Sequence, residues 1–319
     1  MREQVAGALL RIGTRGSQLA RAQASWVQER LRAAGPEAEL VIIRTQGDLL
    51  PEASLTKIGG KGVFVKELEN ALFAGEIDFA VHSLKDLPVE IAQGLTIAAV
   101  TERVEARDVL CTRYGETLET LAGGARLATS SLRRKAQILA ARADLQIVEV
   151  RGNLDTRLRK LAEGEFDALM AAAAGLIRLG WQERISEYLP FDISLPAPGQ
   201  GALAVEVRTE DGEMREIAAR LNHPPSRAAA EAERAFLSAM GGGCLAPIGA
   251  VGVVEGEDLI LRGMVASVEG RRILREKVCG AAAEPVRVGE ELAGRLFSMG
   301  AQEILSSIPP LQMTGGMAP

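Results

Sequence analysis

The 319-residue sequence predicts two similar α/β lobes followed by a smaller α+β domain. Three observations support this fold class. Apolar strand patterns alternate with amphipathic helix patterns over residues 8–100, and the same alternation returns after a highly charged stretch at 101–108. Beyond residue 247, three strand patterns follow one another with short loops between them, which is typical of an antiparallel meander.

The first lobe is predicted from four strand patterns, which lie at 8–13, 39–45, 77–83 and 95–100. Two amphipathic helices are expected between them, at 17–35 and 63–75, and a polar, glycine-rich loop lies at 45–62. The side chains expected to face the sheet are Leu19, Trp26, Val27 and Leu31 in the first helix, and Val63, Leu68, Leu72 and Phe73 in the second.

The second lobe repeats this pattern. Its strands are predicted at 125–130, 145–150 and 167–172, and its helices at 131–142, 153–164 and 173–181. A proline-rich passage at 189–208 then leads into another strand. We therefore place the first lobe at 1–103 together with 202–222, and the second at 104–201. Two such lobes normally enclose a ligand at the carboxyl ends of their strands.

The C-terminal domain is expected at 223–319. A helix beginning at Ser226 and closed by Gly241 precedes three antiparallel strands, and a last helix is predicted over 288–305. The tail from residue 308 is expected to be disordered. The predicted strands of this domain lie at 248–254, 258–267 and 271–278.

Composition excludes several functional classes. A net charge of −5 and 3% aromatic residues disfavour a nucleic-acid partner. No run approaches the roughly 18 apolar residues of a membrane span, and the N-terminus lacks the pattern of a cleavable signal. Three cysteines suggest a reducing compartment, so we expect a cytoplasmic protein. His82 and His223 are far apart, so no metal site is predicted.

Arginines at a predicted helix start point to an anion site. Ser130 or Ser131 can cap the helix at 131–142, yet Arg133 and Arg134 occupy its first turn, where the helix dipole disfavours cations. Backbone N–H groups and two guanidinium groups there are suited to a carboxylate or phosphate. The alternative interpretation is a solvated basic face.

Further cations accumulate near predicted strand ends, and together they favour a small ligand with several negative charges. A P-loop is excluded because Leu55 and Gly62 stand where IGGKG would need glycine and Ser or Thr. The polar residues of this group are Arg15, Ser17, Lys57, Lys61, Arg151, Arg157 and Arg178.

Two further residues are candidates for chemistry. Asp86, beside Lys85 in HSLKDLP, directly follows an apolar strand, where a carboxylate can shuttle a proton or stabilise a developing cation. The alternative is a turn-capping aspartate before Pro88. Cys244 follows three glycines, so it is either a small buried residue or an attachment point, whereas Cys111 and Cys279 lie in strand patterns.

Eight segments together resemble the porphobilinogen deaminase family, also called hydroxymethylbilane synthases. They occur in the family's order over nearly the whole chain, and HSLKDLP, SSLRR and GGGC form a highly specific set. The segments are TRGSQLA, TKIGGKGVFVKELE, AVHSLKDLP, ATSSLRRKAQ, VRGNLDTRL, AAAGLIRLG, LPAPGQGAL and GGGCLAPIG.

The resemblance implies a transferase of tetrapyrrole and heme biosynthesis. Its dipyrromethane cofactor would be held by a thioether to Cys244, and four porphobilinogen molecules would be joined to it before hydroxymethylbilane is released. Asp86 would be the catalytic residue. Cofactor contacts would come from Ser17, Lys85, Asp86, Thr129, Ser131, Arg133 and Arg134, and substrate contacts from Arg15, Ser17, Lys57, Arg151, Arg157, Arg178 and Gln200.

The resemblance further implies a monomer whose only partner is the small-molecule substrate. Gln200 would lie where the chain crosses back to the first lobe. RTQGD and Ile177 differ from some relatives, which leaves details of carboxylate binding open. The alternatives are a non-enzymatic, two-lobed anion-binding protein with lobes like those of periplasmic binding proteins, and an anion-handling transferase without a covalent cofactor.

Overall fold

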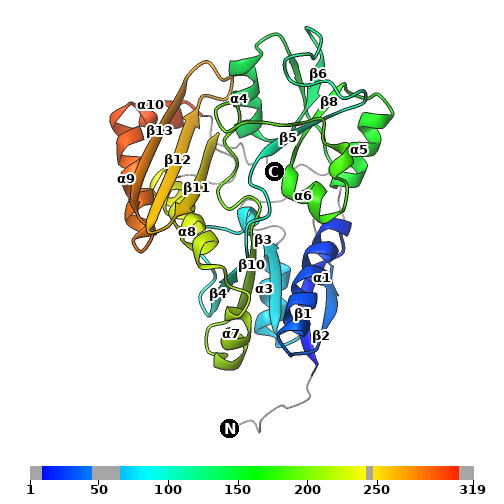
Figure 1. Cartoon of the computed structure of the whole chain (residues 1–319), viewed down its shortest axis with the longest axis vertical. Coiled ribbons are helices and arrows are strands. Elements are labelled where there is room, and N and C mark those ends of the chain that lie inside the picture. Colours follow the sequence, from blue (N-terminus) through cyan, green and yellow to red (C-terminus); the bar gives the residue numbers. More distant parts are fainter. Residues whose placement is uncertain (1–8, 45–64, 242–246, 309–319) are drawn as a thin grey trace, which may run out of the picture.

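Two five-stranded sheets of the same topology and one three-stranded sheet make up the fold. The computed structural model describes residues 9–44, 65–241 and 247–308. In Figure 1 the first lobe lies at the bottom, the second at the top right and the C-terminal domain at the left. The predicted fold class is confirmed.

The first sheet has four strands that run in one direction and one that runs antiparallel to them. β1 is parallel to β2 and β3, whereas β10 is antiparallel to β3 and β4. In order, the strands are β2 (Ala38–Ile43), β1 (Leu10–Arg15), β3 (Phe79–Ser83), β10 (Leu203–Arg208) and β4 (Leu95–Val100). The helices of this lobe are α1 (Gln18–Ala33), α3 (Lys66–Phe73) and α7 (Gly212–Ala219).

The second sheet repeats that arrangement, with β6 parallel to β7 and β8, and β5 antiparallel to β8 and β9. In order, its strands are β7 (Gln146–Val148), β6 (Arg126–Ala128), β8 (Ala168–Ala172), β5 (Asp108–Thr112) and β9 (Glu187–Tyr188). Its helices are α4 (Leu132–Ala141), α5 (Leu154–Ala162), α6 (Ala173–Arg178) and the short 3₁₀ helix η2 (Gln182–Arg184).

The chain passes between the lobes twice, through residues 101–107 and 189–202, which we call the crossing segments. They run beside each other, because the Val104 N–H donates to the Gly201 carbonyl at 3.2 Å. The antiparallel strand of each sheet adjoins a crossing segment, β5 in the second lobe and β10 in the first. The crossing segments therefore bring residues from both lobes into one place.

The C-terminal domain packs three helices on an antiparallel sheet. Phe236, Leu261 and Leu292 are fully buried in its core. Gly263 allows close packing, since a Cβ there would lie 2.7 Å from Leu292 Cδ2. The elements are α8 (Pro224–Ala239), β11 (Ile248–Glu255), β12 (Asp258–Ala266), β13 (Ile273–Ala281), α9 (Pro285–Ser298) and α10 (Ala301–Ser306).

Three local predictions were wrong. α8 begins at Pro224 rather than Ser226, because proline fits the first helical turn and the His223 ring caps the helix by accepting from the Ser226 N–H. Phe73 is 52% exposed at the end of α3 instead of facing the sheet. The single helix predicted at the end of the chain is divided into α9 and α10, because Gly300 adopts a φ of 95° between them.

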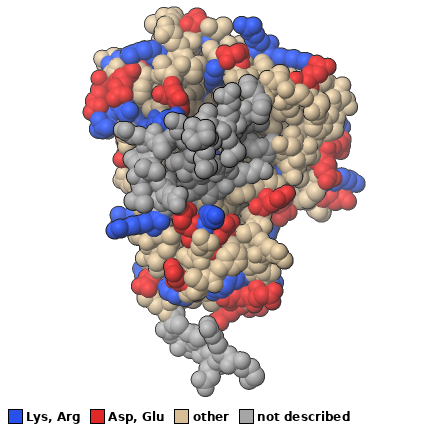
Figure 2. Space-filling view, turned by 180° about the vertical axis from the view of Figure 1, so that it is seen from behind, with Lys and Arg blue, Asp and Glu red and all other residues tan. Residues whose placement is uncertain are grey.

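Across the described ranges, no helix is both long enough and apolar enough to cross a membrane. On the face drawn in Figure 2, groups of basic and of acidic side chains are interspersed over the described parts of the chain.

Candidate active site

Asp86 is displayed by a short turn at the end of β3. The turn is the 3₁₀ helix η1 (Leu84–Asp86), and its two apolar neighbours, Leu84 and Leu87, are buried in one cluster. The Leu84 N–H donates to the Ala202 carbonyl at 3.1 Å, which ties the turn to a crossing segment. The buried leucines on either side anchor the turn, and Asp86 between them is exposed to solvent.

Lys85 is half-buried and turned toward the second crossing segment. Its Nζ donates to Gln200 Oε1 at 3.2 Å. Desolvation lowers the pKa of Lys85 to about 8, with the nearby Arg134 and Arg133 lowering it further and Asp86 and Asp108 acting in the opposite direction. Lys85 is therefore mostly charged at neutral pH but loses its proton more readily than an ordinary lysine, and an anion bound beside it would favour the charged form.

Gln200 connects Lys85 to the second lobe. Its side chain is fully buried, and its Nε2 donates to the Ala106 carbonyl at 2.7 Å and to Asp108 Oδ1 at 3.0 Å. The Gln200 amide therefore contacts the first lobe with its oxygen and the second lobe with its nitrogen. This placement agrees with the crossing position predicted for Gln200.

Arg133 and Arg134, the predicted anion-binding pair, are buried against an internal carboxylate. Arg133 Nη1 lies 2.6 Å from Asp108 Oδ2, and Arg134 Nη2 lies 2.7 Å from Asp108 Oδ1. Ser194 Oγ also donates to Asp108, at 2.9 Å. Burial alone would raise the pKa of Asp108, but the two guanidinium groups outweigh it and hold the pKa below its usual range.

Sequence reasoning missed Asp108. One aspartate at the start of the apolar run DVLCT carries no periodic signal, and its partners lie 25 or more residues away in the chain. A polar residue at the start of an otherwise buried strand was the one available hint.

Two more arginines of the second lobe are largely buried, and one of them, Arg157, lies near Arg134. Burial, together with the positive charge of Arg134, lowers the pKa of Arg157, whose Nε donates to the Gly152 carbonyl at 2.8 Å. Burial lowers the pKa of Arg178 to about 10, and its Nη2 donates to the Gly201 carbonyl of a crossing segment at 2.8 Å. The guanidinium groups of Arg157 and Arg178 are thus desolvated cations, and each donates to a backbone carbonyl.

The remaining predicted contact residues lie at the ends of strands and the starts of helices. Ser17 caps α1 and Ser131 caps α4, by accepting from the Ala20 and Arg134 N–H groups. Thr129 is buried and accepts from the Ser131 N–H at 3.2 Å. Arg151 pairs with Glu149 at 2.6 Å, and Arg15 ends β1.

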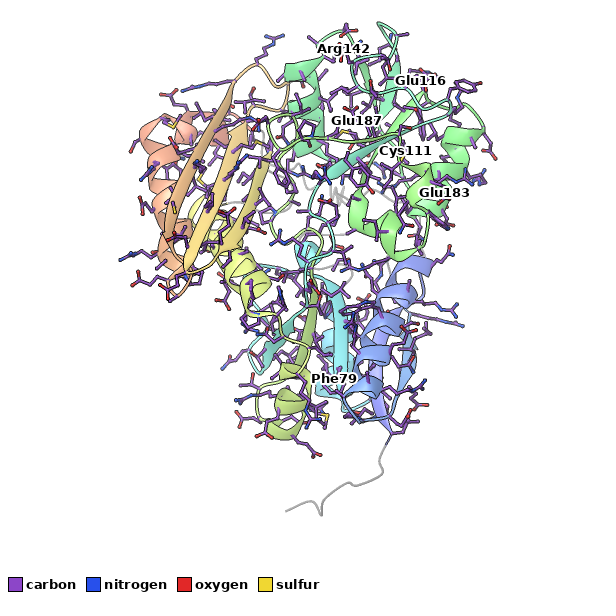
Figure 3. The ribbon with its side chains drawn as sticks, in the orientation of Figure 1. Phe79, Cys111, Glu116, Arg142, Glu183 and Glu187 are labelled. Carbon is purple, nitrogen blue, oxygen red and sulfur yellow. The ribbon has the colours of Figure 1, made fainter. Side chains whose placement is uncertain are left out.

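The cysteines differ sharply in environment. Cys111 lies within β5 of the second lobe, as Figure 3 shows, and burial raises the pKa of its thiol to about 12. Cys279 is exposed on β13. Cys244 falls outside the described residues, as do Lys57 and Lys61.

The charges of the described site leave an excess of cations. Besides burial, the positive charge of Arg134 lowers the pKa values of Lys85, Arg133 and Arg157, while Asp86 and Asp108 are the carboxylates that raise the pKa of Lys85. Such a donor set suits a small ligand bearing several carboxylates, and dipyrromethane, with its acetate and propionate groups, is of this chemical kind.

Comparison with known proteins agrees with this chemistry. Residues 10–216 match the family model "Porphobilinogen deaminase, dipyromethane cofactor binding domain", and residues 228–298 match "Porphobilinogen deaminase, C-terminal domain". The chain belongs to the porphobilinogen deaminase family. This assignment replaces the non-enzymatic alternative with an enzyme of tetrapyrrole biosynthesis that has a dipyrromethane cofactor.

Two family members show the extent of the similarity. The porphobilinogen deaminase of Desulforudis audaxviator is 51% identical over 299 residues, which cover 93% of this chain and 97% of that protein. The enzyme of Geobacter metallireducens is 49% identical over 301 residues, 94% of each chain. A methionine-bound nutrient-binding protein from Burkholderia cenocepacia is 14% identical with a TM-score of 0.42, covering 66% of this chain and 90% of that one.

Replacing Asp108 should destabilise the protein strongly. Asp108→Asn keeps the shape but leaves two buried guanidinium groups without a counter-charge, so we expect the free energy of unfolding to fall by about 3–5 kcal/mol. Urea unfolding followed by circular dichroism measures this, with Asp144→Asn, which alters an exposed ion pair with Arg142, as the control.

The same variant tests the pH dependence. Because folding lowers the pKa of Asp108, its contribution is complete above about pH 4, the ordinary aspartate range, and is lost as the pH falls through the lower folded value. The difference between wild type and Asp108→Asn should therefore be constant near neutrality and shrink in acid. Equal stabilities of Asp108→Asn and Asp144→Asn at pH 7 would contradict the assigned role.

Proposed function

We propose that this chain is a hydroxymethylbilane synthase that joins four porphobilinogen molecules, one at a time, to a dipyrromethane held on Cys244, and then releases hydroxymethylbilane by hydrolysis. The observation that carries the proposal is the match of the two family models to residues 10–216 and 228–298. The excess of cations beside Asp86 supports it independently.

The cofactor would be held by hydroxyl and cationic groups from both lobes. We assign its acetate and propionate groups to Ser17, Lys85, Thr129, Ser131, Arg133 and Arg134, and its covalent attachment to the sulfur of Cys244. When bound, the cofactor supplies the terminal pyrrole carbon to which the first substrate is joined. Asp108 keeps Arg133 and Arg134 oriented, so that little side-chain entropy is lost when a carboxylate binds.

Substrate binding would use the remaining cations. We assign the carboxylates of porphobilinogen to Arg15, Ser17, Lys57, Arg151, Arg157, Arg178 and Gln200. Arg157 and Arg178 are already desolvated, so a carboxylate that replaces their carbonyl contacts relieves an unfavourable environment. Gln200 would position Lys85 rather than neutralise charge, because an amide carries none.

Asp86 would carry the chemistry. In each step the C–N bond of the protonated aminomethyl group of porphobilinogen breaks, its electron pair leaves with nitrogen, and neutral ammonia departs. The remaining substrate cation is spread over the pyrrole ring, and the exposed carboxylate of Asp86 can hydrogen-bond the ring N–H and offset that charge. After the new carbon–carbon bond forms, Asp86 can accept the ring proton that is lost.

We also propose the domain limits and cellular setting given by the sequence. The first lobe would comprise 1–103 with 202–222, the second 104–201, and the cofactor-anchoring domain 223–319. Membership of β10 in the first sheet supports the return at residue 202. The protein would act as a cytoplasmic monomer with porphobilinogen as its small-molecule partner.

Replacing Asp86 tests the catalytic assignment. Asp86→Asn keeps size and polarity but removes the charge and the proton acceptor, so ammonia release at saturating porphobilinogen should fall by about 10²–10⁴-fold. The variant should still bind substrate. Glu90→Gln, another exposed carboxylate shortly after Asp86, is the matched control and should keep near-normal activity. Equal rates for the two variants would refute the role of Asp86.

Lys85 predicts the alkaline limb of the pH profile. The pKa of Lys85 is about 8 without a bound carboxylate, and a carboxylate raises it, so Lys85 loses its charge at or above pH 8 and kcat/KM for porphobilinogen should decline there. Arginine keeps its charge, so Lys85→Arg should move the decline to higher pH even if its maximal rate is reduced. Steady-state rates between pH 6 and 10 measure this. An unchanged alkaline limb in Lys85→Arg would show that another group controls it.

A further inference from the structure

Helix α8 contacts the first lobe through one face. Arg227, Ala230 and Arg234 are spaced three and four residues apart and therefore share that face. Ala230 is buried in the apolar cluster that also contains Leu84 and Leu87, on either side of Lys85 and Asp86. The helix of the C-terminal domain therefore packs directly against the turn that displays Asp86.

Arg234 binds the backbone immediately after Asp86. Its Nη1 donates to the Leu87 carbonyl at 3.4 Å, and its Nη2 donates to the carbonyls of Pro88 at 2.6 Å and Val89 at 2.9 Å. Three successive carbonyls thus share one guanidinium group. The segment has no regular secondary structure, so the guanidinium group supplies the hydrogen bonds that these carbonyls would otherwise accept from backbone N–H groups of a helix or sheet.

The helix that carries Arg234 is itself firmly placed. The buried carboxylate of Glu233, the preceding residue, lies 2.7 Å from Arg103 Nη2 and accepts from the Gly199 N–H at 2.6 Å. It also accepts from the Gly252 N–H of β11 at 2.7 Å. Glu233 therefore fixes α8 to both crossing segments and to its own sheet, and Arg234 extends that fixed frame to the Asp86 turn.

We propose that Arg234 is a positioning residue for Asp86: by holding the carbonyls of residues 87–89, it fixes where the turn leaves η1 and so where the carboxylate points. The inference rests on the proposed function, because it assigns Arg234 a role through Asp86. A planar guanidinium reaches several carbonyls with a fixed geometry, which a lysine ammonium does not reproduce. Small displacements of a catalytic group are costly in rate.

The test compares Arg234→Ala and Arg234→Lys with Arg227→Ala. Arg227 is a matched control, because it lies on the same face of α8 and donates to the carbonyls of Ile97 and Ala98 in β4, away from Asp86. Each variant is mixed with saturating porphobilinogen, quenched at intervals and weighed by intact mass spectrometry, which counts the units added to the chain. KM, the melting temperature and hydrogen exchange over residues 84–90 are measured beside it.

We expect Arg234→Ala to add units about 10–100-fold more slowly than the wild type with KM within about twofold. Arg234→Lys should fall between the two. Hydrogen exchange over residues 84–90 should be faster in Arg234→Ala than in Arg227→Ala, which reports loosening of the turn without reference to activity. Arg227→Ala should lose stability but keep its rate within about twofold, since a lost surface contact changes stability by modest amounts.

Several results would overturn the inference. They are equal rate losses in Arg234→Ala and Arg227→Ala, a rise in KM with no change in rate, or a folded Arg234→Lys that adds units at the wild-type rate. If Arg234→Ala does not fold, Arg234→Lys decides the question. A wild-type chain that adds no units at all would refute the proposed function instead, so the two failures are distinguishable.

Discussion

The site depends on one buried carboxylate. Asp108 takes hydrogen bonds from Arg133, Arg134, Ser194 and Gln200, which are drawn from α4 and from a crossing segment. An ionised group without water is costly unless it is paired and hydrogen-bonded, and here every bond to it also orients a partner. Two guanidinium groups against a single carboxylate leave a net positive charge, which is what a carboxylate-rich ligand requires.

The lobes are coupled through that same carboxylate. The Gln200 amide bonds both Asp108 and Lys85, the neighbour of Asp86, so one amide links the cationic part of the second lobe to the Asp86 turn of the first. A second buried carboxylate, Glu233, binds the crossing segments to the C-terminal domain. Both contacts fall where the chain passes between lobes, so any movement of one lobe against the other must be accommodated around them.

Sequence patterns predicted the fold and singled out Arg133 and Arg134, but not the pairing of these two residues with Asp108. The alternation of apolar strands and amphipathic helices is local, and it located the sheets well. Arg133 and Arg134 stood out because cations in a first helical turn break a local rule. Asp108 and Glu233 gave no such signal, because their partners are distant in sequence. The His223 cap was missed for a different reason, since Ser226 is the more usual capping residue.

The central claim is that the chain carries its dipyrromethane cofactor on Cys244, and peptide mapping tests this claim most directly. Trypsin separates the three cysteines, since Cys111, Cys244 and Cys279 lie in peptides 108–113, 235–262 and 278–287. After exposure to porphobilinogen, the 235–262 peptide should be heavier by at least two porphobilinogen units less two ammonia molecules, and a Cys244→Ser chain should lack this addition. An adduct on the peptide of Cys111 or Cys279, or none at all, would contradict the account.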